Sequence, residues 1–97
     1  MIRNNDYEKS VLLVGFIKAV RDSISENESI SEAVFTPVIG GYKISFLNGG
    51  VSVTLTAEVK GFFAKRLIIK KCVGEKKTLY KICGAEEISR CAEELLT

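Results

Sequence analysis

Apolar residues in the first quarter of the chain recur at helical spacing. Residues 5–25 place seven of them on one broad stripe: Leu12, Leu13, Phe16, Ile17, Ala19, Val20 and Ile24. Asn5 is a favourable N-cap, and Glu8 stands three residues later, where its carboxylate can reach back to the cap amide. This pattern predicts an amphipathic helix that ends near Ser25 and packs its apolar stripe against a core.

The spacing changes to every second residue from Ala33 onward, which is typical of strands in a half-buried antiparallel sheet. Residues 25–31 are predicted to form the connector before the first strand, Val34–Ile39. Pro37 has no amide hydrogen to donate, so this strand is expected at an edge of the sheet. Four connections then separate the strands: Gly40-Gly41, Asn48-Gly49, Lys60-Gly61-Phe62 and Gly74-Glu75.

These connections sort large apolar side chains onto one side of the predicted sheet. The turns at Asn48-Gly49 and Gly74-Glu75 give five such pairs: Phe46 with Val51, Ile44 with Val53, Tyr42 with Leu55, Ile69 with Tyr80, and Leu67 with Ile82. The turn at Gly40-Gly41 adds Ile39 and Phe35 to the same side. A slip of one residue would turn every side chain to the other face, so this agreement supports the predicted faces.

A short second helix is predicted after Gly84, with four small or apolar residues at helical spacing: Ile88, Cys91, Ala92 and Leu95. The expected architecture is an α+β two-layer sandwich. It consists of an N-terminal helix, a five-stranded antiparallel meander and a C-terminal helix, with both helices on one face of the sheet. Ninety-seven residues suffice for one hydrophobic core, so residues 1–97 are expected to form a single domain.

Charge is distributed very unevenly along the chain. The segment Lys60–Lys81 holds eight of the 14 basic residues and one acid, Glu75, which gives a net charge of +7 (8 − 1). The rest of the chain holds six basic and eleven acidic residues, or −5 (6 − 11). Folding does not require such asymmetry, whereas docking onto a negatively charged partner benefits from it.

On the last predicted hairpin, four cations alternate with apolar or thiol side chains on the side away from the helices: Arg66, Lys70, Lys77 and Lys81. Lys65, Lys71 and Lys76 add charge at the ends of the hairpin. We therefore predict a small non-enzymatic protein that docks onto a polyanionic partner, most simply the backbone of DNA or RNA. The same lysines would also protect an exposed hairpin from aggregation, and the sequence leaves that interpretation open.

The alternative is a protein–protein interaction module, such as a small regulator, an immunity protein or a phage-type inhibitor. Its basic face would meet an acidic protein surface, or two copies would form a homodimer. Apolar residues outside the predicted core motivate this alternative: Tyr7, Val11 and Val14 on the first helix, and Val34, Val38 and Leu47 on the outer side of the first hairpin.

Other function classes lack the residues they need. The chain has no histidine, the commonest general base, so we expect no catalytic residues and no small-molecule substrate. Three cysteines without metal-ligand spacing, Cys72, Cys83 and Cys91, predict no metal and no other cofactor, and they suit a reducing cytoplasm. The longest apolar stretch is interrupted by Lys18, and no signal-peptide pattern opens the chain. We therefore expect a cytoplasmic protein without membrane contact.

Overall fold

The computed structural model describes residues 11–61 and 66–97. Its elements are helix α2 (Val11–Glu26), strands β1 (Ile30–Val38), β2 (Gly41–Asn48), β3 (Val51–Lys60), β4 (Arg66–Val73) and β5 (Lys76–Ile82), the 3-10 turn η2 (Ala85–Glu87) and helix α3 (Ile88–Leu95). This order confirms the predicted α+β architecture. The predicted helix cap, Asn5 with Glu8, lies outside the described residues.

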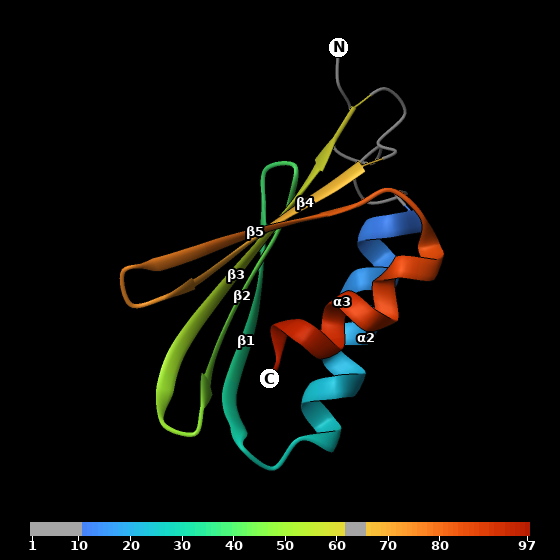
Figure 1. The fold of residues 1–97 in the computed structure, drawn as a ribbon. Helices are drawn as coiled ribbons and strands as arrows, with labels where there is room; N and C mark the ends of the chain where they lie inside the picture. The colour runs from blue at the N-terminus through green and yellow to red at the C-terminus, as the bar shows by residue number, and fades with distance from the viewer. Residues whose placement is uncertain (1–10, 62–65) are drawn as a thin grey trace.

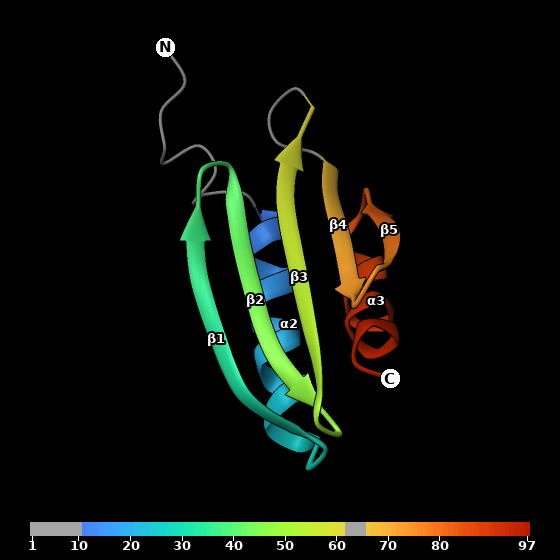
Figure 2. The same cartoon turned by 90° about the vertical axis from the view of Figure 1, so that its left-hand side faces the viewer.

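The five strands form one sheet in the order β1-β2-β3-β4-β5, and each strand is antiparallel to the next. This confirms the predicted meander, with β1 and β5 at its edges. Figures 1 and 2 show both helices on the same side of the twisted sheet, so that the other side is left uncovered by helices. Pro37 therefore lies in an edge strand, as its missing amide hydrogen predicts.

The core lies between the sheet and the two helices. Helix α2 buries five residues of its predicted stripe: Leu12, Leu13, Phe16, Ile17 and Val20. The other two, Ala19 and Ile24, are partly buried and pack against the core. Helix α3 buries the predicted set Ile88, Cys91, Ala92 and Leu95. From the sheet, alternate residues complete the core: Ile44, Phe46, Val53, Leu55, Ala57, Val59, Leu67, Ile69 and Ile82. The period-two pattern therefore identified the inner face correctly.

The β2–β3 turn lies one residue later than predicted. Its central residues are Gly49 and Gly50, with φ of 58° and 85°, rather than Asn48 and Gly49. A type I′ turn needs positive φ at both central positions, and two glycines adopt it without steric cost. Asn48 remains in β2, where its Nδ2 donates to the Leu96 carbonyl oxygen at 3.2 Å.

The strand pairs across this turn consequently shift by two residues. Phe46 lies opposite Val53, Ile44 opposite Leu55 and Tyr42 opposite Ala57. Val51, which was expected opposite Phe46 on the core side, pairs with Asn48 at the end of the sheet and is 52% exposed. Because the shift is even, Phe46, Ile44 and Tyr42 and their new partners all stay on the predicted face.

The β1–β2 turn is Ile39-Gly40 rather than Gly40-Gly41. Gly40 has a φ of 79°, while Gly41 lies in β2 opposite Val38. A Cβ at Gly41 would collide with the backbone of Ala57 in β3, so glycine is needed there for strand packing. The prediction that Ile39 faces the core is wrong, because this residue is in the turn and is 96% exposed. Phe35 does pack against the core, opposite Ile44.

Strand β1 also begins earlier than predicted, at Ile30 rather than Val34, and the connector shrinks to residues 27–29. Between Ser31 and Val34 the pairing with β2 is irregular, and Glu32 has a φ of 54°. Side-chain spacing in this stretch does not keep a period of two, which explains why the pattern did not reveal the start of the strand.

Of the two remaining predicted connections, the one between β3 and β4 is wrong and the one between β4 and β5 is confirmed. The three-residue loop predicted at residues 60–62 is wrong, because Lys60 pairs with Arg66 and the connection spans residues 61–65. Phe62, Phe63 and Lys65 lie outside the described residues. The turn at Gly74-Glu75 is confirmed, with Leu67 opposite Ile82 and Ile69 opposite Tyr80.

Candidate functional site

The side of the sheet away from the helices, which we call the outer face, is not used by the core. Side chains alternate along each strand, so its members are the residues between the buried ones. They are Val34, Thr36 and Val38 of β1; Lys43, Ser45 and Leu47 of β2; Ser52, Thr54, Thr56, Glu58 and Lys60 of β3; Arg66, Ile68, Lys70 and Cys72 of β4; and Lys77, Leu79 and Lys81 of β5.

The β4–β5 hairpin brings four of the predicted cations together on this face. Ile68 lies opposite Lys81, Lys70 opposite Leu79, and Cys72 opposite Lys77, as predicted. Arg66 begins β4 on the same face. We call the four residues Arg66, Lys81, Lys70 and Lys77, in this spatial order, the cation ladder. All four are exposed.

The ladder places a cation on alternating strands at every two-residue step. Diagonal neighbours on antiparallel strands are about 7–8 Å apart at Cα, so no two ladder cations lie directly opposite each other. Three steps of two residues extend over about 20 Å along the hairpin. This spacing limits mutual repulsion while keeping one line of positive charge.

Two further cations on the outer face were not predicted as contacts. Lys43 lies on β2 opposite Thr56, and Lys60 lies on β3 opposite Arg66. The Lys60 Nζ is 3.2 Å from Glu58 Oε2, and both side chains are about half exposed, so this ion pair adds little stability. On β2 to β5 the outer face therefore has six cations and one acid, a net charge of +5 (6 − 1). Continuing the alternation of Thr54 and Thr56 to the end of β3 would have found Lys60.

Two predicted contacts, Lys71 and Lys76, are not part of this surface. Lys71 shares a row with Leu55 and Thr78, and Lys76 lies opposite Val73, which places both on the helix side of the sheet. Lys71 is also partly buried. Strand alternation is the cause, since sequence neighbours point to opposite faces. Lys65 lies outside the described residues.

The apolar residues predicted as partner contacts fall on two separate surfaces. Val34, Val38 and Leu47, which we call the apolar margin, lie on the outer face at the β1 side; Val34 is 58% exposed and Leu47 half-buried. Val11 and Val14 project from α2, which lies behind the sheet in Figure 2. The two groups therefore cannot contact one flat partner together. Tyr7 lies outside the described residues.

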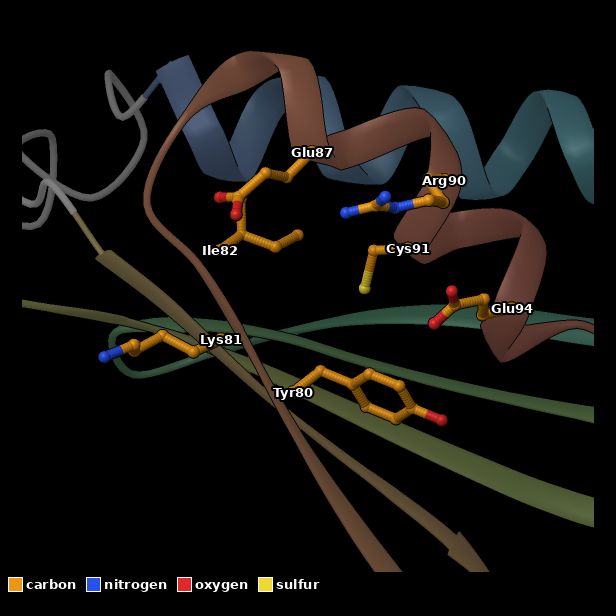
Figure 3. Close-up of a pocket in the computed structure, with 7 residues that line it drawn as sticks. All are labelled: Tyr80, Lys81, Ile82, Glu87, Arg90, Cys91 and Glu94. Carbon is orange, nitrogen blue, oxygen red and sulfur yellow. The ribbon is translucent and has the colours of Figure 1, made fainter.

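A shallow pocket of about 130 Å³ separates β5 from α3. It is lined by Tyr80, Lys81, Ile82, Glu87, Arg90, Cys91 and Glu94. Figure 3 shows Arg90 and Cys91 pointing from α3 toward β5. Burial, reinforced by the nearby carboxylates of Glu94 and Glu87, raises the pKa of the Cys91 thiol to about 11, so it stays protonated at neutral pH. A protonated thiol is a poor nucleophile and a poor metal ligand.

Glu87 in this pocket has a structural role. Its Oε2 accepts hydrogen bonds from the backbone N–H of Cys83 at 2.8 Å and of Gly84 at 3.0 Å. These two bonds lower the pKa of the Glu87 carboxyl. The carboxylate thereby fixes the bend by which the chain leaves β5 and enters α3. Within residues 11–61 and 66–97, no three His, Cys, Asp or Glu side chains cluster so as to hold a metal ion.

No protein-family model, curated protein or solved structure matches this chain. In the described ranges, no helix combines the length and the apolar composition needed to cross a membrane.

Proposed function

We propose that the protein is a small non-enzymatic binding protein whose outer face docks onto the phosphate backbone of a nucleic acid. The observation that carries this proposal is the excess of six cations over one acid on the outer face of β2 to β5. Each cation that replaces counterions at a phosphate makes binding more favourable and salt-dependent. Solubility alone would be served by a mixture of both signs, so a surface of one sign favours a binding role.

The arrangement of the neighbouring residues supports the same function. Beside the cation ladder, β2 and β3 present small hydroxyl side chains that can donate to phosphate oxygens: Ser45, Ser52, Thr54 and Thr56. Three free thiols, Cys72, Cys83 and Cys91, suit a cytoplasmic protein, where such groups stay reduced. We include this location in the proposal.

The experiment exploits the alternation of faces within one hairpin. Lys70→Glu/Lys77→Glu reverses two ladder cations, whereas Lys71→Glu/Lys76→Glu reverses their sequence neighbours on the helix side. Both variants change the net charge by the same amount in the same two strands. Affinity for a labelled nucleic acid is measured by fluorescence anisotropy over a range of salt concentrations.

Loss of two phosphate contacts should weaken the outer-face variant about 60-fold near 0.1 M salt and reduce the salt slope by about 1.8. The helix-side variant should stay within about threefold of the wild type, since only screened long-range charge changes. Because Lys71 is partly buried, circular dichroism and urea unfolding confirm that each variant is folded. Equal loss of affinity in both variants would show that the outer face is not the binding surface.

A protein partner is the second candidate, favoured by the exposed apolar side chains on the same face. Leu79 is 69% exposed within the ladder, and Val34 and Val38 line the β1 side. An acidic protein surface, or a second copy of this chain, would cover them. Binding of polyglutamate without binding of DNA or RNA would favour the acidic partner. A stable dimer by light scattering that Val34→Asp/Val38→Asp dissociates would favour the homodimer.

A further inference from the structure

Every aromatic side chain in the described part of the chain is buried in the core or packs against it. Phe16 and Phe46 are buried, while Phe35, Tyr42 and Tyr80 pack against the core cluster. The ring of Phe35 is further covered by the Arg21 guanidinium, 5.0 Å from the ring centroid. The outer face of β1 to β5 therefore offers no aromatic platform on which an unpaired base could stack.

From this we infer that the outer face binds double-stranded nucleic acid by its phosphates alone, with the duplex axis following the β4–β5 hairpin. The inference rests on the proposed function and narrows the ligand from nucleic acids in general to duplexes. Proteins that bind single strands without sequence preference gain much of their affinity by stacking bases on aromatic side chains. Without that gain, a flexible single strand must be ordered by electrostatics alone, whereas a duplex is already stiff and carries charge at higher density.

The positions of the cations set the direction of the duplex. Four cations follow the hairpin for about 20 Å, whereas Lys43 is the one cation on the outer face of the described β1 and β2. At about 3.4 Å per base pair, the ladder is as long as roughly six base pairs measured along the duplex axis. A duplex lying across the sheet would instead rest on the apolar margin, which offers no charge to its phosphates.

The residues between the ladder cations are consistent with backbone contact. Ile68 and Leu79 are aliphatic and sit within the ladder, and neither can donate or accept a hydrogen bond at a base edge. Sequence is read mainly by hydrogen bonds to base edges in the grooves. Binding through this surface is therefore expected to be nearly independent of sequence.

The test compares a duplex of about 12 base pairs with a thymine single strand of equal length, using labelled DNA and, separately, an RNA duplex. The wild-type protein should bind both duplexes at least about fivefold more tightly than the single strand. With four ladder contacts, the slope of log K against log salt should be near −3.6 for the DNA duplex. Equal or tighter binding of the single strand overturns this inference and leaves the proposed function standing. Binding to none of the three overturns both.

The direction of the duplex is tested by adding charge at the apolar margin. Val34→Lys/Val38→Lys introduces two exposed cations three strands away from β4, a distance of about 14 Å. If the duplex follows the hairpin, these cations lie beyond its phosphates, and duplex affinity should change by less than about threefold. The matched variant Thr54→Lys/Thr56→Lys, next to β4, should increase affinity by about tenfold or more. A larger gain at the margin than beside the ladder would overturn the proposed direction.

Discussion

The two hairpins at opposite edges of the sheet, β1–β2 and β4–β5, share one design on the inner face and differ on the outer face. Inside, Ile44 of β2 and Ile69 of β4 are both fully buried in the same core. Outside, the first hairpin presents apolar side chains and Lys43, and the second presents the cation ladder. Packing constrains only the inner face, so the charge collected on one outer half indicates a requirement other than folding.

The two edge strands also differ in the regularity of their pairing. Strand β1 is interrupted twice, by the irregular pairing between Ser31 and Val34 and by Pro37, which lacks an amide hydrogen. Strand β5 pairs regularly with β4 from Val73 opposite Lys76 to Leu67 opposite Ile82. Backbone irregularity makes β1 a poor template for pairing with a strand of another chain, and lysine charge disfavours such pairing at β5. The cations of β5 would therefore protect this edge from pairing with other chains as well as contact the proposed partner.

The largest expected loss of stability comes from truncating a core residue, and it should be similar in the two hairpins. Ile44→Ala and Ile69→Ala should each lower the free energy of unfolding by about 2–5 kcal/mol, because each leaves a cavity in a fully buried site. Urea unfolding followed by circular dichroism measures both. A loss below about 1 kcal/mol for either residue would show that its hairpin does not share the common core.

A smaller loss of stability is expected from replacing one glycine in each hairpin, Gly41 in β2 and Gly74 in the β4–β5 turn. Gly41→Ala forces a Cβ into the backbone of β3, and we expect a loss of about 3 kcal/mol. Gly74, with φ of 61°, has open space around it, so Gly74→Ala should cost only the left-handed backbone penalty, about 1–2 kcal/mol. The same urea experiment ranks the two. If Gly74→Ala were the more damaging change, the packing role assigned to Gly41 would be wrong.

The smallest expected effect concerns how each edge strand is anchored. Strand β1 is held at its start by a neutral bond, in which Gly49 N–H donates to the Ser29 carbonyl oxygen at 2.8 Å. The bend after β5 is held by the Glu87 carboxylate, whose pKa is lowered by the N–H groups of Cys83 and Gly84. A lowered folded-state pKa means that the stabilisation is present above the ordinary value of 4.5 and is lost as the pH falls below it.

Glu87→Gln should therefore unfold at lower urea than the wild type at pH 7, and the two midpoints should converge at acid pH, as the pH falls below 4.5. Glu86→Gln, a neighbouring exposed carboxylate, is the matched control and should leave the midpoint nearly unchanged at both pH values. A difference between Glu87→Gln and wild type that persisted unchanged at low pH would mean that charge is not what anchors the bend.

Periodicity predicted the faces of the sheet because alternation is dictated by strand geometry and survives any even shift of register. The Gly49-Gly50 turn shifted the pairs of Phe46 and Ile44 by two residues without moving either from the core. Turn positions were less predictable, since a glycine can serve φ, as Gly50 does, or close strand packing, as Gly41 does. Composition alone does not distinguish these two uses.

The same reasoning explains which parts of the candidate site were predictable. The register across Gly74-Glu75 is enough to place the four ladder cations together. Lys71 and Lys76 are next to ladder cations in sequence, but alternation puts them on the other face of the sheet. Alternation within one strand puts Lys43 and Lys60 on the outer face, but their positions relative to the ladder depended on two connections that the sequence placed wrongly.

The unequal edges limit how copies of this chain could assemble by extending their sheets. Growth of a continuous fibre needs two receptive sides on every subunit, and here one side is broken by a proline and a kinked backbone. Two copies meeting through their regular edges would bury the receptive side of both, so that assembly would stop at a closed pair. Neutralising the lysines of that edge, for example by acetylation, would therefore yield discrete dimers in preference to fibrils.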